Sequence, residues 1–288
     1  MNIKRRIVLH YRRILRRRRT RQRLFCLAVL IFVVVFTLAN RAHRANPSMQ
    51  DYASAFGIGR GIDPSMKEWY VPVSYRGVVI KNRIKGFPHK VIALTFDDGP
   101  SARITPRVLQ TLDKYDVRAT FFIVGQMAQY HPELLTRVVS QGHAIGNPTY
   151  SHAKEPTVKT AELELSKTDE MIRQATGHAP ICFRPPYGIA DSSYTRVAVE
   201  RGYCAINWTV CEPAGKYVSA EAIVNRVTKD PQPGDIILMH DGPGHTGSLA
   251  ALPSIIKRLR AKGFRFVTVP ELLQAWDAWQ KPHVGAAS

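Results

Sequence analysis

The stretch Val91–Pro100, VIALTFDDGP, joins an apolar run directly to two adjacent carboxylates. A short apolar run that ends in polar residues fits a buried strand. Asp97 and Asp98 follow this run, and parallel α/β folds build their sites where strands end. Asp, Gly and Pro also favour turns, so these residues alone could mark only the end of a strand. The stretch predicts a strand of a parallel sheet with two candidate site residues behind it.

The same pattern recurs along the rest of the chain. Apolar runs of strand length alternate with amphipathic stretches of helix length, which indicates βαβ units. We expect strands at residues 91–96, 119–124, 143–146, 181–184, 204–208, 235–240 and 264–269, and helices at 105–115, 132–141, 160–176, 192–201, 219–228 and 250–262. Residues 68–84 predict a small hairpin or edge strands. Seven strands favour an α/β fold of the distorted (β/α)7–8 barrel type over a doubly wound open sheet.

Two later predicted strands also end in a residue that can take part in catalysis or binding. Arg184 ends the run at 181–184, and His240 ends the run at 235–240. The carboxyl ends of parallel strands meet at one edge, so both side chains should approach Asp97 and Asp98. Singly, Arg184 could belong to a loop stiffened by the two prolines that follow it, and His240 could be a core histidine. Their common position favours a site.

The N-terminal part carries much of the net charge of +19. Eleven Lys and Arg residues and no acid lie in residues 1–23, and the first acidic residue is Asp51. The apolar run at 24–39 follows, with Thr37 as its one polar residue, and it comes close to the length of a membrane span. Basic residues concentrated on one side place the N-terminus in the cytoplasm and the rest of the chain outside.

These features predict a basic head at 1–23, a transmembrane signal-anchor at 24–39, a linker at 40–66 and a barrel domain at 67–288 with short N-terminal strands. A cleaved signal peptide is the alternative and would give a secreted form. The arginine-rich head could bind nucleic acid, but beside an apolar span anionic lipid headgroups are the nearer partner. We expect a single-pass plasma-membrane protein and no nucleic-acid partner.

The four cysteines do not predict a disulfide framework. Cys26 lies in the predicted span, which leaves Cys182, Cys204 and Cys211 in the barrel domain. Cys182 and Cys204 fall within apolar strand-like runs, so we expect them to be small buried hydrophobic residues.

Four motifs occur in a specific order along the chain. They are TFDDGP at 95–100, NPTYSH at 147–152, RPPYG at 184–188 and ILMHDG at 237–242. Over about residues 90–276 the chain resembles the polysaccharide deacetylases, the NodB-homology group of carbohydrate esterases. The resemblance implies a distorted (β/α) barrel that removes acetyl groups from glycans such as peptidoglycan, chitin-like polymers or xylan. It also implies a divalent metal, often zinc, held by one Asp and two His.

The resemblance assigns Asp98 and His152 as metal ligands and Asp97 as the general base, with Arg184 orienting that base. These roles are chemically consistent. A bound metal polarises an acetyl carbonyl and lowers the pKa of water, and a free carboxylate can accept the water's proton. A guanidinium beside the base keeps it ionised.

The resemblance gives the remaining roles to residues of the last two motifs. Tyr187 would line the oxyanion and substrate site. His240 would be the general acid that protonates the departing amine, with Leu238 beside it as a substrate contact.

The first departure from the family pattern is Pro148, which stands where the family has the first histidine of its metal loop. A catalytic zinc site generally uses three protein ligands, and only Asp98 and His152 remain. We expect weak or absent zinc, with Glu155 and His245 as possible substitutes.

The second departure follows Trp208. The family has a D-x-x-D-W-like pattern there, in which an aspartate orients the acid histidine, and this chain has Cys211 and Ala214 at the aspartate positions. We expect His240 to lack its carboxylate partner unless Glu212 reaches it, and to be a weaker acid as a result. The sequence therefore supports a cell-envelope glycan deacetylase of reduced activity, or a silent glycan-binding or scaffold protein.

Overall fold

The computed structural model describes residues 69–154, 156–215 and 217–281. The predicted head, membrane span and linker lie outside these residues, and so does Glu155. Within the described part of the chain, no helix has both the length and the apolar character needed to cross a bilayer.

The strands confirm the predicted parallel α/β fold. Every strand pair in the described ranges is parallel. All seven predicted strands are present, and the strands are β1 Val79–Ile80, β2 Val91–Asp97, β3 Thr120–Phe122, β4 Ala144–Gly146, β5 Cys182–Phe183, β6 Cys204–Ile206, β7 Val210–Cys211, β8 Ile236–His240 and β9 Arg265–Val267.

The strands form two sheets. One has the order β1-β6-β5, and the other has the order β4-β3-β2-β8-β7, with β9 also paired to β2. A single bridge between Asn147 and Phe183 links the end of β4 to β5. Full closure into a barrel of seven or eight strands stays a prediction.

The helices also follow the predicted pattern. The six predicted helices are confirmed as α3 Thr105–Lys114, α5 Pro132–Ser140, α6 Val158–Thr176, α7 Ser193–Glu200, α8 Ala220–Thr228 and α9 Thr246–Ala261. Two further helices were not predicted, α4 Gly125–Tyr130 and α10 Val269–Gln280. Helix α10 begins at a capping box, in which Thr268 and Glu271 satisfy each other's backbone N–H groups.

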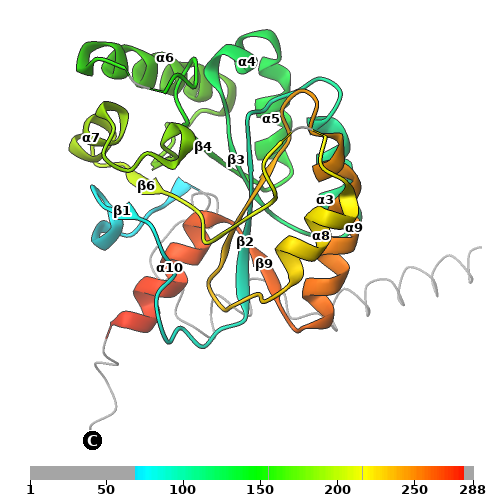
Figure 1. Cartoon of the computed structure of the whole chain (residues 1–288). Helices are drawn as coiled ribbons and strands as arrows, with labels where there is room; N and C mark the ends of the chain where they lie inside the picture. The colour runs from blue at the N-terminus through cyan, green and yellow to red at the C-terminus, as the bar shows by residue number, and fades with distance from the viewer. Residues whose placement is uncertain (1–68, 155, 216, 282–288) are drawn as a thin grey trace, which may run out of the picture. The chain divides into compact units, whose positions relative to one another are not determined.

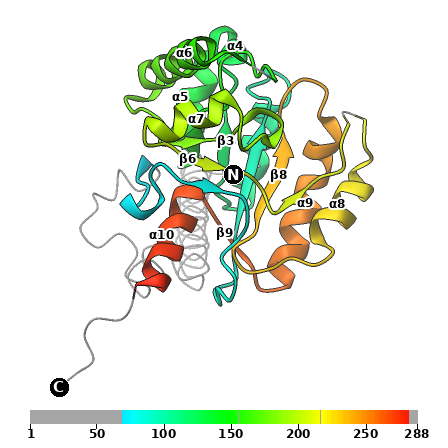
Figure 2. The same cartoon turned by 60° about the vertical axis from the view of Figure 1, so that its left-hand side comes forward.

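The buried core of the sheet fixes the strand ends at which the predicted site residues lie. All seven residues of β2 are buried, so the strand that carries Asp97 is fixed on both faces. Figures 1 and 2 show β2 and β3 at the centre with helices around them, α8 packed on α9 at one side and α6 packed on α7 at the other. Rigid strands of this kind position side chains more tightly than loops do.

Residues 68–84 were predicted to form a small hairpin or edge strands, and the described residues form an edge strand, β1. Val79 and Ile80 pair in parallel with Ala205 and Ile206 of β6, which places β1 at the edge of the three-stranded sheet. A short 3-10 turn, Val73–Tyr75, precedes this strand.

The three cysteines within the described ranges, Cys182, Cys204 and Cys211, are free thiols. Cys182 and Cys204 are register partners in β5 and β6, and both are buried, as predicted. Burial raises the pKa of Cys182 to about 12, so its thiol stays protonated and unreactive at neutral pH.

Candidate functional site

Strand register brings two of the sequence-predicted residues together. In the β2–β8 pair Asp97 lies opposite His240, although 143 positions separate them in the chain. Both residues are the last of their strands, so they lie at the edge where parallel α/β folds place their sites. The predicted convergence of the strand ends is therefore present in the structure.

Arg184 reaches the same edge from the segment after β5. Its Nη1 donates to Asp97 Oδ1 at 2.7 Å and to Thr95 Oγ1 at 2.8 Å, and its Nε donates to the Ile206 carbonyl at 3.1 Å. The guanidinium carbon also lies 4.0 Å from the centre of the Phe122 ring. These contacts hold Arg184 rigidly, so it fixes the position of the Asp97 carboxylate.

The pKa of Asp97 is raised above its ordinary value. Burial is the larger cause, and the charge of Arg184 opposes the rise. A carboxylate that is more basic than usual, and held by a cation, is suited to accept a proton from water.

His240 has a carboxylate partner. Its Nδ1 lies 2.6 Å from Glu212 Oε1, and a carboxylate can only accept, so Nδ1 carries the proton of this hydrogen bond. Glu212 is buried and also accepts from the Ser248 hydroxyl, which lies 2.7 Å from Oε1. Burial lowers the pKa of His240, but the hydrogen bond to Glu212 and the charges of Asp97 and Glu212 outweigh this effect and raise it.

His240 therefore has a carboxylate partner, and this partner is Glu212, the alternative that the sequence left open. Ala214 is exposed on its loop, whereas Glu212 follows β7 and is buried beside His240.

Asp98 has a histidine near each of its carboxylate oxygens. His152 Nε2 lies 4.0 Å from Oδ1, and His245 Nε2 lies 3.7 Å from Oδ2. The Asp98 side chain is 37% exposed, so the group is open to solvent. Asp98 and His245 also line a cavity of about 220 Å³ with Val124, Gln126, Met127, Ser151 and Pro243.

The loop that carries His152 is held by its own side chains. Asn147 Oδ1 accepts from the Thr149 N–H at 2.7 Å, and Thr149 Oγ1 accepts from the His152 N–H at 3.0 Å. Pro148 lies buried between them. This network gives His152 a fixed position even though residue 148 provides no imidazole.

Backbone strain is concentrated at the same edge. Four of the five described non-glycine residues with positive φ belong to it, namely Asp98, Thr149, His152 and Tyr187. Such conformations cost about 1–3 kcal/mol each and cluster at functional sites.

The two predicted substrate contacts differ in exposure. Tyr187 is 62% exposed, and its ring centre lies 5.2 Å from that of His152. Leu238 is 6% exposed, and it pairs in register with Thr95 of β2. Tyr187 is therefore free to contact a ligand at the edge, whereas Leu238 contributes chiefly to the wall beneath it.

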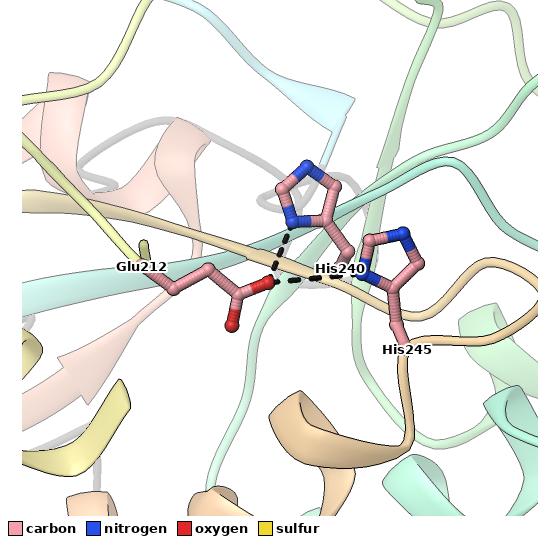
Figure 3. A group of neighbouring side chains, drawn as sticks. All are labelled: Glu212, His240 and His245. Atoms are coloured by element: carbon pink, nitrogen blue, oxygen red, sulfur yellow. Dashed lines mark hydrogen bonds and ion pairs between the residues drawn. The ribbon is translucent and has the colours of Figure 1, made fainter. Parts of the chain in front are cut away.

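A second group of candidate metal ligands shares His245 with the group around Asp98. Glu212, His240 and His245 each offer a possible metal-ligating atom, and these atoms lie within 4.8 Å of one another (Figure 3). The two imidazole rings stack with centres 4.6 Å apart, and His245 Nδ1 lies 4.0 Å from Glu212 Oε1. His245 thus faces Asp98 with one ring nitrogen and Glu212 with the other.

Comparison with known proteins agrees with the geometry. A family model described as polysaccharide deacetylase matches residues 85–206, a range that ends before β7 and β8. The chain is 41% identical over 187 residues to a peptidoglycan-N-acetylglucosamine deacetylase of Bacillus cereus, which covers 64% of this chain and 68% of that protein.

Two further matches cover a similar part of the chain. A peptidoglycan-N-acetylglucosamine deacetylase of Listeria monocytogenes is 36% identical over 213 residues, and the alignment spans 73% of this chain but only 44% of that relative. A crystal structure of a peptidoglycan N-acetylglucosamine deacetylase aligns with a TM-score of 0.63 at 38% identity, over 65% of this chain and 90% of that one.

Proposed function

The chain belongs to the polysaccharide deacetylase family, and on this basis we propose that it hydrolyses N-acetyl groups on a glycan of the peptidoglycan type. Relatives named as peptidoglycan-N-acetylglucosamine deacetylases support N-acetylglucosamine units as the substrate. One observation carries the proposal: Asp97 and His240 lie side by side at the ends of paired strands, Asp97 is paired with Arg184, and His240 is hydrogen-bonded to Glu212. Amide hydrolysis needs a base and an acid so arranged.

The residues around Asp98 fit the divalent metal that the family implies. A carboxylate and imidazole nitrogens are donors that zinc binds, and they lie in a solvent-accessible position beside the base. A metal held there would polarise the acetyl carbonyl and lower the pKa of a bound water towards about 7.

The chain's own residues would perform the proton transfers. Asp97 accepts a proton from the attacking water while Arg184 keeps the carboxylate ionised and oriented. His240 then gives a proton to the departing amine from Nε2, because its Nδ1 is engaged by Glu212. A buried carboxylate partner stabilises the imidazolium form that acts as the acid.

We further propose that the protein acts at the cell envelope. The support is the order of segments in the sequence, a basic head followed by an apolar run at 24–39. A peptidoglycan-type substrate lies outside the membrane, so this topology would bring the folded domain to it. Tyr187, exposed beside His152, is the residue that we assign to contact the sugar.

The test is acetate release by the purified full chain. An N-acetylglucosamine oligomer and an O-acetylated xylan should be incubated separately, each with added zinc or cobalt and each beside the Asp97→Asn variant. The proposal expects release from the oligomer that depends on Asp97. Binding of the oligomer without any release would support the silent glycan-binding alternative, and release from xylan alone would assign the acetyl esters as substrate.

A further inference from the structure

Pro148 removes one imidazole from the loop that carries His152, yet a second imidazole faces Asp98 from another part of the chain. His245 Nε2 lies 3.7 Å from Asp98 Oδ2, on the loop between β8 and α9. We propose that His245 is the third protein ligand of the metal site, with Asp98 and His152, and so replaces the imidazole that Pro148 lacks. The inference rests on the proposed function and assigns the ligands of its metal.

The two imidazoles flank Asp98, each near a different oxygen of its carboxylate. Bonds of about 2.0–2.2 Å in a tetrahedral zinc site place ligand atoms about 3.3–3.5 Å apart. The two separations around Asp98, 4.0 Å to His152 and 3.7 Å to His245, exceed this range by only a few tenths of an ångström. The ligand atoms of Asp98, His152 and His245 are not all within 4.8 Å of one another, so the side chains must rotate for one metal to reach all three.

The overlapping cluster of Glu212, His240 and His245 fits a metal less well. Glu212 Oε1 and His240 Nδ1 are 2.6 Å apart, which is a hydrogen-bond distance and too short for two ligands of one tetrahedral metal. Glu212 is also engaged by the Ser248 hydroxyl. In this cluster His240, the proposed acid, is hydrogen-bonded to the Glu212 carboxylate, and His245 stacks beside His240.

Glu212 also has the position of an outer carboxylate for His245. Its Oε1 lies 4.0 Å from His245 Nδ1, the ring nitrogen opposite the one that faces Asp98. Metal-binding histidines usually direct their second nitrogen to a carboxylate, carbonyl or water, which fixes the ring and raises its basicity. One glutamate would therefore orient both the acid and the new ligand.

The fold brings the His245 loop against Asp98. A Cβ on Gly242 would lie 2.7 Å from the Asp98 carbonyl oxygen and 2.6 Å from its Cβ, so only glycine allows this approach. The His245 N–H donates to the Gly242 carbonyl, and the His245 ring is buried and stacks on His240. The imidazole is thus held beside Asp98 before any metal binds.

The direct test is zinc affinity measured on the full chain without a histidine tag, by competition with a coloured chelator, together with the visible spectrum of the cobalt form. We expect one zinc per chain. Replacing Asp98 by Asn, or His152 or His245 by Gln, should each weaken binding more than about 100-fold, beyond the usual loss for an outer-shell partner. His131→Gln, remote from the site, is the matched control and should leave affinity unchanged.

A rescue variant separates ligation from folding. Pro148→His in the His245→Gln background returns an imidazole four positions before His152 and should recover most of the lost affinity. His240→Gln should weaken zinc binding less than tenfold. The inference is overturned if His245→Gln keeps the wild-type affinity, if the rescue variant recovers none of it, or if His240→Gln abolishes binding while His152→Gln does not.

These outcomes are independent of acetate release. Zinc bound through the three residues without any deacetylation would contradict the proposed function and leave the ligand assignment standing. If the protein deacetylates the oligomer but His245→Gln leaves its zinc affinity unchanged, the ligand assignment is contradicted and the proposed function stands.

Discussion

Glu212 Oε1 lies 2.6 Å from His240 Nδ1, which joins the end of β8 to the segment that follows β7. The buried carboxylate reaches His240 from two residues before Ala214, directly after β7. Side chains at different positions of one loop can meet the same histidine if the strand before the loop places them within reach. A departure from a motif is therefore no evidence by itself that the contact is lost.

The Glu212–His240 pair predicts a change in pH dependence. Glu212→Gln removes the charge that helps to raise the pKa of His240, so His240 should lose its proton at lower pH. The alkaline limb of the profile of acetate release against pH should move to lower pH, and the rate at its optimum should fall about 10- to 100-fold. An unchanged alkaline limb would mean that His240 is not the acid.

Ala214→Asp is the matched control for this variant. Ala214 is exposed, and His240 already has a carboxylate, so a second one should change the rate less than about twofold. A large gain from Ala214→Asp in steady-state assays would show that Glu212 is a poor partner.

The Arg184–Asp97 pair predicts an effect on stability. Arg184→Met leaves Asp97 buried without its cation and should lower the free energy of unfolding by about 3–5 kcal/mol. Adding Asp97→Asn removes the uncompensated charge, so the double variant should be more stable than Arg184→Met alone. Urea denaturation followed by circular dichroism measures both. Equal stability of the two variants would contradict the charge argument.

The close approach of Gly242 to Asp98 predicts that a larger residue at position 242 weakens zinc binding. In Gly242→Ala the new Cβ must displace the Asp98 backbone or the loop that carries His245. Zinc affinity should therefore fall, and the melting temperature should fall by a few degrees. Affinity equal to that of the wild type would show that the loop adapts without moving His245.

The N-terminal segments predict where the protein resides. With residues 24–39 as an anchor, the chain should fractionate with membranes, and protease added to intact cells should digest the folded domain. A soluble, shortened form in the medium would indicate a cleaved signal, whereas a domain protected from protease would contradict the proposed topology.

The sequence predicted the elements whose pattern is local. The seven strands and six helices follow from apolar runs and helical periodicity, and Asp97, Arg184 and His240 were found because each lies at the end of a predicted strand. Helix α4 was missed because six residues give almost two turns and little periodicity. Helix α10 was missed although Thr268 and Glu271 give a capping signal, because the strand predicted at 264–269 overlapped the start of the helix.

Contacts between residues far apart in the chain could not be predicted from the sequence. The edge strand β1 pairs with β6 across more than a hundred residues, and no local pattern in residues 68–84 indicates such a partner. His245 and Asp98 are 147 positions apart, and their proximity depends on the β2–β8 register and on Gly242. A sequence could nominate His245 as a substitute ligand, but only the fold gives the distance.

The most direct measurement is acetate release from an N-acetylglucosamine tetramer by the full chain with zinc added. It should be run beside Asp97→Asn, His245→Gln and the Pro148→His, His245→Gln double variant. We predict release by the wild type, a loss of about 10²- to 10⁴-fold in Asp97→Asn, a similar loss in His245→Gln, and recovery in the double variant. Release by the wild type no greater than that of Asp97→Asn, with zinc shown to be bound, would contradict the account of an active deacetylase.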